Sequence, residues 1–206
     1  LVASGKPMAL SDVGKKFGYS VPSALKTKKW IHYTNRHVER DPLDRGKYTQ
    51  DFPPYLNTQQ SDSLKRIVQA IDDEKHKVFL VNGVTGSGKT EIYLNALEYV
   101  ISKGGRGIVM VPEISLTPQV IERFESRFPN QVAVLHSGLS RGEQFDQWWA
   151  IHKGQYGIVV GSRSAIFGPQ PNLKLIIIDE EHEWTYKQQD VSPRYHSRDV
   201  AIKLGE

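Results

Sequence analysis

The feature that most constrains the fold is the segment 83–90, GVTGSGKT, which fits the phosphate-binding pattern G-x-x-x-x-G-K-[ST]. This pattern works between a strand and a helix, because glycines let backbone N–H groups turn around an anion and the helix N-terminus adds its positive dipole end. The apolar, β-branched run 77–81 precedes the motif and predicts a buried strand. Apolar residues at near-helical spacing follow it from Ile92 to Ile101 and predict a helix.

Each residue of this P-loop has an expected role. Lys89 would reach the β- and γ-phosphates, and the Thr90 hydroxyl would hold Mg²⁺. The other expected nucleotide-binding residues of the loop are Gly83, Thr85, Gly86, Ser87 and Gly88. ATP and Mg²⁺ are therefore the expected cofactors, and a glycine-rich turn without a ligand is the alternative.

A second candidate site follows the last apolar run of the chain. Residues 176–178 are three isoleucines that lead into Asp179, Glu180, Glu181 and His182. Acids at the carboxyl end of a buried strand lie where open α/β sheets bind ligands. Asp179 would orient Mg²⁺ alongside Thr90, and Glu180 would polarise the attacking water, so these acids and Lys89 are the expected catalytic residues. The alternative is an exposed acidic turn.

From residue 57 onward, strand-like and helix-like segments alternate. Besides 77–81, apolar runs predict strands at 108–111, 132–135, 158–160 and 173–178. Helix N-termini are predicted at Thr117 with Pro118, and at Ser140 with Glu143. This alternation predicts an α/β fold, a RecA-like P-loop parallel sheet with helices on both faces.

The N-terminal quarter differs from the rest in charge and pattern. Residues 1–50 carry ten Lys and Arg against four Asp and Glu, a net charge of +6, whereas the remainder carries −2. This imbalance indicates a polyanionic partner, although an ordinary solvated face has the same composition. Two short helical patterns ending at Gly18 and near Lys29, followed by a strand-like run at 30–33, predict a winged helix-turn-helix. A small helical linker domain is the alternative.

These patterns divide the chain into three parts. Residues 1–45 are expected to form a partial winged-helix DNA-binding domain, 46–56 a linker, and 57–206 the ATP-binding lobe. Three prolines and a glycine between residues 41 and 55 exclude a regular element there. The chain has no cysteine, which excludes disulfides and a cysteine-built zinc site. With no initiator methionine, no signal peptide and no long apolar run, we expect a piece of a longer cytoplasmic protein without a membrane span.

Several segments together resemble a helicase family. The DEAH-like box at 179–182, combined with this P-loop, resembles helicase superfamily 2. Residues 56–60, LNTQQ, resemble the segment in which a glutamine recognises adenine, and the match falls on Gln60. Residues 111–119 are similar to motif Ia of these helicases. Residues 136–140 and 161–167 are similar to further motifs that contact the DNA strand. With an aromatic-rich stretch at 184–196, they resemble the PriA-type helicases of replication restart.

This resemblance implies an ATP-dependent 3′–5′ DNA helicase motor that acts at stalled or collapsed replication forks and in primosome assembly. The implied partners are forked and single-stranded DNA, primosome proteins and single-strand-binding proteins, in a bacterial cytoplasm and associated with the nucleoid. Rings would stack on bases and cations would contact phosphates. The residues expected to contact DNA or to couple it to hydrolysis are Arg163, Trp184, Tyr186, Lys187, Arg194 and Tyr195. The alternatives are that the aromatic residues serve only in core or surface packing and that Arg163 pairs with a nearby acid.

The resemblance also implies parts that lie outside this chain. Family helicases place a second motor lobe with an arginine finger further along, and a zinc module elsewhere, so no zinc site is expected among these 206 residues. Without the finger, this chain is expected to bind nucleotide and DNA but to hydrolyse ATP poorly. Two other functions stay open: a restriction or remodelling translocase, and a DNA-binding regulator gated by nucleotide.

Overall fold

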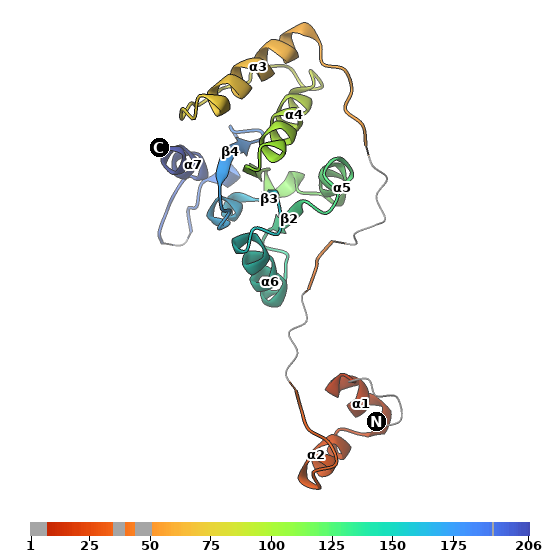
Figure 1. Cartoon of the computed structure of the whole chain (residues 1–206). Helices are drawn as coiled ribbons and strands as arrows, with labels where there is room; N and C mark the ends of the chain where they lie inside the picture. The colour runs from red at the N-terminus through yellow and green to blue at the C-terminus, as the bar shows by residue number, and fades with distance from the viewer. Residues whose placement is uncertain (1–7, 35–39, 44–50, 191) are drawn as a thin grey trace. The chain divides into compact units, whose positions relative to one another are not determined.

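The computed structural model describes residues 8–34, 40–43, 51–190 and 192–206. The chain divides into two compact units, Leu1–Val38 and Glu39–Glu206, which are described separately (Figure 1).

The first unit contains two short helices, α1 (Leu10–Phe17) and α2 (Ser20–Thr27), within residues 8–34. α1 ends at Gly18, whose φ of 89° is a conformation that glycine adopts without a Cβ clash. The strand expected at 30–33 is not formed, and Trp30 is 69% exposed. A strand needs a hydrogen-bonding partner, and no other strand lies within the described part of this unit. The rest of the expected wing at 35–39, residues 44 and 45, and the first part of the linker at 46–50 lie outside the described residues.

A four-stranded parallel sheet forms the centre of the second unit. The strands are β1 (Arg106–Met110), β2 (Val132–Leu135), β3 (Ile158–Gly161) and β4 (Leu173–Ile178). Their order in the sheet is β2-β3-β1-β4, with Met110 beside Gly161 on one side and beside Ile178 on the other. Because all strands run in the same direction, all their carboxyl ends lie at one edge of the sheet.

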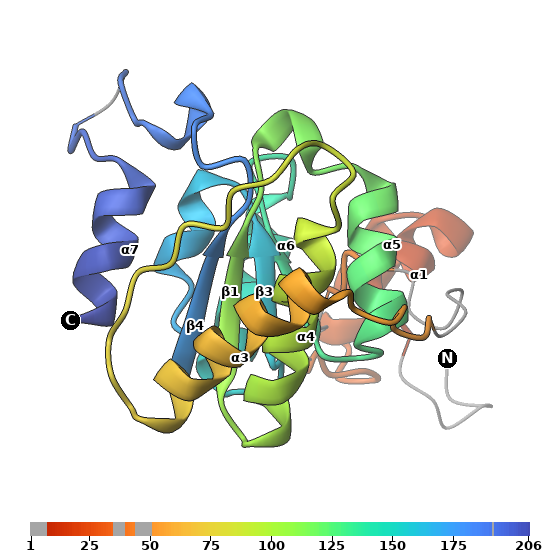
Figure 2. The same ribbon diagram turned by 90° about the horizontal axis from the view of Figure 1, so that it is seen from above.

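Alternate residues of the strands point to opposite faces, and each face has its own core. Val109 and Val160 pack against α4 (Lys89–Ser102) and α5 (Pro118–Arg127). Ile108 and Val159 pack against residues of α6 (Arg141–His152), η2 (Arg163–Phe167) and α7 (Ser197–Gly205), while α3 (Thr58–Asp72) packs against α4 (Figure 2). The two remaining 3₁₀ turns are η1 (Glu113–Ser115) and η3 (Trp184–Tyr186). The predicted α/β class, a parallel sheet covered on both faces, is confirmed.

The helix starts predicted from local chemistry are also confirmed. The Thr117 side chain accepts the Val120 N–H, and Pro118 occupies the first turn of α5. Ser140 and Glu143 form the reciprocal capping box of α6.

The strand predicted at 77–81 is absent, which corrects the sequence interpretation. These residues form an irregular connection between α3 and α4, in which Val78 is 67% and Leu80 is 78% exposed (Figure 2). Within the described residues, β4 pairs with β1 alone and no strand lies on its other edge. A β-branched run fits a sheet, but it becomes a strand only where a neighbouring backbone offers hydrogen bonds.

We predict that Gly161→Ala destabilises the chain much more than Gly107→Ala. A Cβ at Gly161 would lie 2.0 Å from the backbone oxygen of Leu135, whereas one at Gly107 would lie 2.4 Å from Cδ2 of Leu97, the end of a side chain, which can shift at less cost than a backbone atom. We expect losses of about 3 kcal/mol or more and about 1 kcal/mol, respectively, in the free energy of unfolding measured by urea denaturation. Equal losses would show that the β2–β3 backbone spacing is not fixed as described.

Candidate nucleotide site

The segments with expected chemistry collect at the carboxyl edge of the parallel sheet. β1, β3 and β4 end at Met110, Gly161 and Ile178, which lie in one register, and each is followed by a motif segment. Open parallel sheets bind ligands outside this edge. The fold therefore brings to one place chain segments that lie far apart in the sequence.

Two glycines of the P-loop have a left-handed backbone. Gly86 and Gly88 have φ values of 78° and 80°, which favour glycine, and Gly88 is the N-cap residue of α4. Residues 83–87 are exposed, and the Ser87 N–H donates to the Val84 carbonyl at 3.1 Å within the loop. Lys89 Nζ donates to the carbonyl oxygens of Gly83 (2.7 Å) and Val84 (3.2 Å). The ammonium group thus lies over the loop, beside the helix N-terminus that would face an anion.

Gln60 contacts the P-loop from α3. Its Nε2 donates to the Ser87 carbonyl at 2.9 Å, and its Oε1 accepts the Asn57 N–H at 2.8 Å as part of the α3 capping box. The structure thus places Gln60 beside the P-loop. Adenine recognition stays a prediction, because the amide would have to exchange one of these partners.

The Asp179 carboxylate is held by both of its oxygens. Oδ1 accepts the Glu180 N–H at 3.1 Å, and Oδ2 accepts the Tyr93 hydroxyl at 3.1 Å. Burial, and then the nearby Asp179 charge, raise the pKa of the Tyr93 hydroxyl, which therefore keeps its proton and donates. Since Tyr93 lies on α4 one turn after Lys89, this bond joins the helix that follows the P-loop to the segment 179–182, here called the acid box.

Glu180 follows with a left-handed backbone, at φ 47°, which is uncommon for a residue with a Cβ. Its side chain is 49% exposed, and Glu180 Oε2 lies 3.8 Å from His182 Nδ1. The carboxylate is therefore accessible to water, as a group that polarises a water molecule must be.

The side chains around Tyr93 suit a hard cation. Thr90 lies three residues before Tyr93 on α4, and the Tyr93 hydroxyl donates to Asp179, so both expected Mg²⁺ ligands are neighbours of this tyrosine. Both ligands are oxygens, which Mg²⁺ prefers. Within the described residues no group of three or more His, Asp or Glu could hold an ion, so Mg²⁺ here would take its other ligands from nucleotide phosphates and water.

Arg163 holds the aromatic-rich segment. Its Nη1 donates to the carbonyl oxygens of Lys187 (3.0 Å) and Thr185 (3.4 Å). The Arg163 carbonyl in turn accepts the Ser197 hydroxyl at 3.1 Å. Nη1 is thus engaged by backbone carbonyls, and no ion pair joins Arg163 to an acid among the described residues; a DNA contact through the rest of the guanidinium stays a prediction.

Tyr186 is buried, which contradicts a base-stacking role for its ring. It is 1% exposed, and its hydroxyl donates to the Asp179 carbonyl at 2.7 Å and lies 3.1 Å from the Met110 carbonyl. The ring fills the core on the α6 and α7 face of the sheet. A coupling role for Tyr186 stays a prediction, now with a direct contact to the acid box.

The other expected DNA contacts lie on the surface. Trp184 is 73% exposed, and Lys187 and Arg194 are exposed as well. Tyr195 packs edge-on against Phe167, with ring centroids 5.1 Å apart, which leaves part of its ring accessible. A backbone bridge between residues 187 and 196 brings the two ends of this segment together.

Sequence reasoning missed Tyr93. Its position four residues after Lys89 could have indicated a role in the site, because residues four apart lie on one face of a helix. The P-loop pattern ends at Thr90 and says nothing about that position.

Among the described residues, no helix combines the length and the apolar character needed to cross a bilayer.

Comparison with known proteins gives consistent relatives. The sequence model of the family described as type III restriction enzyme, res subunit, matches residues 54–203. The replication restart protein PriA of Bacillus subtilis (strain 168) is 54% identical over 169 residues, covering 82% of this chain and 21% of that protein. PriA of Haemophilus influenzae (strain Rd) is 41% identical, covering 92% of this chain and 26% of that protein. PriA of Chlamydia trachomatis serovar D is 38% identical, covering 100% of this chain and 28% of that protein.

This chain thus spans between 21% and 28% of the length of these relatives. The match covers the whole parallel sheet, the P-loop and the acid box. The chain belongs to the family of the type III restriction enzyme res subunit, and its parallel sheet is RecA-like.

Proposed function

We propose that this chain is the nucleotide-binding lobe of an ATP-dependent 3′–5′ DNA helicase that restarts replication at stalled or collapsed forks. The observation that carries the proposal is the Tyr93–Asp179 bond of 3.1 Å, which joins the P-loop helix to the acid box. The similarity to replication restart proteins supports the fork as the place of action.

The proposed chemistry is phosphoryl transfer to water. Lys89 would contact the β- and γ-phosphates, together with the backbone N–H groups of the loop. Thr90 and Asp179 would hold Mg²⁺, which supplies charge neutralisation when bound. Glu180 would orient the attacking water and accept its proton. Gln60 would contact the adenine.

We further propose that the aromatic-rich segment 184–196 couples DNA to this site. Trp184 would stack on a base and Lys187 and Arg194 would contact phosphates, while Tyr195 presents a partly covered ring. The backbone of the same segment is held by Arg163, and Tyr186 donates to the Asp179 carbonyl. A shift of the segment on binding DNA would therefore act on the strand end that carries both acids.

The remaining parts of the proposal concern the longer protein. Residues 1–45 would contribute to a winged-helix DNA-binding domain, 46–56 would be a linker, and a second motor lobe and a zinc module would lie outside this chain. The proposed partners are forked and single-stranded DNA, primosome proteins and single-strand-binding proteins, in the bacterial cytoplasm at the nucleoid.

A second candidate function is a translocase of the restriction type, which the match to the family of the type III restriction enzyme res subunit favours. Such a motor shares the P-loop and acid box but has no preference for forks. Unwinding by the full-length protein of forked and of plain duplex DNA separates the two, because equal rates would favour the translocase.

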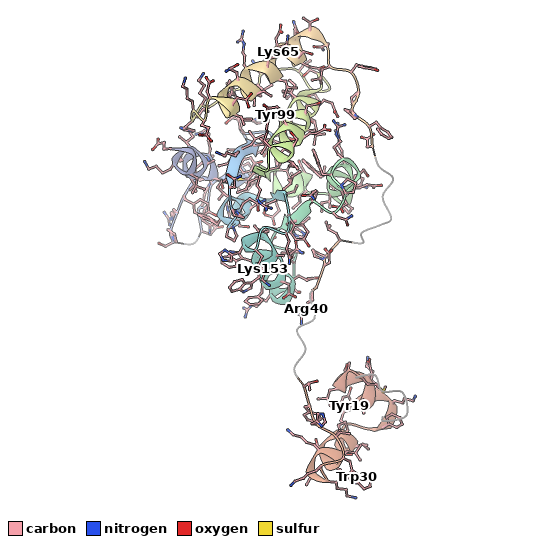
Figure 3. All side chains as sticks on the ribbon, in the orientation of Figure 1. Tyr19, Trp30, Arg40, Lys65, Tyr99 and Lys153 are labelled. Carbon is pink, nitrogen blue, oxygen red and sulfur yellow. The ribbon has the colours of Figure 1, made fainter. Side chains whose placement is uncertain are left out.

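We predict that Lys89→Ala weakens binding of fluorescently labelled ADP to this chain about ten- to hundredfold, the range expected for losing hydrogen bonds to a charged group. Lys65→Ala is the matched control, since the Lys65 side chain is 77% exposed on α3 (labelled in Figure 3). Equal affinity in all three proteins would contradict phosphate binding by the loop.

We predict that this chain alone hydrolyses ATP poorly, with or without single-stranded DNA. An arginine finger is worth about 10³–10⁵ in rate in related NTPases, and we place that residue outside this chain. The measurement compares phosphate release by this chain and by the full-length protein. A rate within about tenfold of the full-length protein would show that the chain already contains a complete active site.

We predict that Trp184→Ala in the full-length protein lowers DNA stimulation of the ATPase while leaving the basal rate unchanged. Loss of one stacked base costs about 1–3 kcal/mol of DNA binding, so the DNA concentration for half-maximal stimulation should rise about five- to hundredfold. Trp149→Ala is the control, because Trp149 is 40% exposed on α6. If DNA stimulates the ATPase of both variants as it does that of the parent, the proposed coupling of DNA to hydrolysis through segment 184–196 is wrong.

A further inference from the structure

Tyr93 lies between the two sides of the candidate nucleotide site. It belongs to α4, directly after the P-loop, and its hydroxyl donates to Asp179 Oδ2 at 3.1 Å. Its ring stacks on Phe124 of α5, with centroids 6.4 Å apart and an interplanar angle of 8°. The ring is therefore fixed by packing, which fixes the position of the hydroxyl.

We propose that Tyr93 is a positioning residue for Mg²⁺ with bound nucleotide, because it orients the Asp179 carboxylate toward the P-loop. This inference rests on the proposed function. Thr90 lies three residues before Tyr93 on α4, so the same helix carries one expected cation ligand and the side chain that orients the other. Partners that orient metal ligands in this way contribute about 10–100-fold to metal affinity or activity in other proteins.

The other bonds of Asp179 explain why this contact matters. Its N–H donates to the Met110 carbonyl at 2.9 Å, and its own carbonyl accepts the Tyr186 hydroxyl at 2.7 Å. These bonds fix the backbone of the strand end. The side chain can still rotate about its own bonds, and the Glu180 N–H restrains one oxygen while the Tyr93 hydroxyl restrains the other.

A phenol suits this position chemically. As a neutral donor it leaves the negative charge of Asp179 available to a cation, whereas a lysine ammonium in its place would compete with Mg²⁺ for the carboxylate. It also occupies one lone pair of Oδ2, so the free lone pairs of the carboxylate face a restricted set of directions.

Tyr93→Phe tests the role of the hydroxyl, because phenylalanine keeps the ring that stacks on Phe124. Tyr99→Phe is the matched control on the same helix, because the Tyr99 hydroxyl donates to Asp72 of α3 and not to Asp179 (Tyr99 is labelled in Figure 3). The measurement is binding of fluorescently labelled ADP to this chain, first with EDTA and then at increasing Mg²⁺ concentration. Circular dichroism and thermal melts show that each variant is folded.

We expect Tyr93→Phe to raise the Mg²⁺ concentration at which binding of the labelled ADP is half-maximally strengthened by about tenfold. Affinity in EDTA should stay unchanged, and Tyr99→Phe should behave as the parent in both conditions. The inference is overturned if the Mg²⁺ dependence of Tyr93→Phe matches the parent, or if affinity in EDTA falls by the same factor. Failure of the parent chain to bind labelled ADP at all would instead remove the proposed function and this inference with it.

A double-mutant cycle separates the role of the Tyr93 hydroxyl from any small change that Tyr93→Phe causes in packing. In an Asp179→Asn background, Tyr93→Phe should have little further effect on the Mg²⁺ dependence, because the carboxylate it orients is gone. Equal effects of Tyr93→Phe in both backgrounds would show that the hydroxyl acts through another group, and the positioning role would be wrong.

Discussion

The parallel pairing of β4 with β1 is the constraint on which the rest of the site depends. It fixes Ile178 beside Met110 and so places Asp179 just beyond the carboxyl edge of the sheet. β1 also packs against α4, the helix that begins inside the P-loop. The core packing therefore holds α4, which begins in the P-loop, close to the end of β4, which leads into Asp179. The Tyr93 hydroxyl on α4 joins the two by its hydrogen bond to Asp179.

Local chemistry in the sequence was enough for much of this structure. The Thr117 N-cap and the Ser140–Glu143 capping box depend on neighbours within a few residues, and both are formed as predicted. Continuous apolar runs identified four strands, because a buried parallel strand needs apolar side chains on both faces. The α/β class follows from their alternation with helices.

What could not be predicted depends on partners far away in the chain. The run 77–81 has strand composition but no strand beside it within the described residues, so it stays irregular and exposed. Tyr186 and Arg163 looked like DNA contacts, yet their distant partners are the carbonyls of Asp179 and Lys187, which no local pattern encodes. Tyr93 was missed for the same reason, since its partner lies 86 residues along the chain.

The central claim is that a nucleotide binds where the P-loop opens α4, with its phosphates between Lys89 and the acid box. The most direct measurement is a crystal structure of this chain with ADP and Mg²⁺. We predict that the β-phosphate lies on the backbone N–H groups of residues 86–90, with Lys89 turned from the loop carbonyls toward it and Asp179 facing the cation. A nucleotide bound elsewhere, or density for side chains filling that position, would contradict the account.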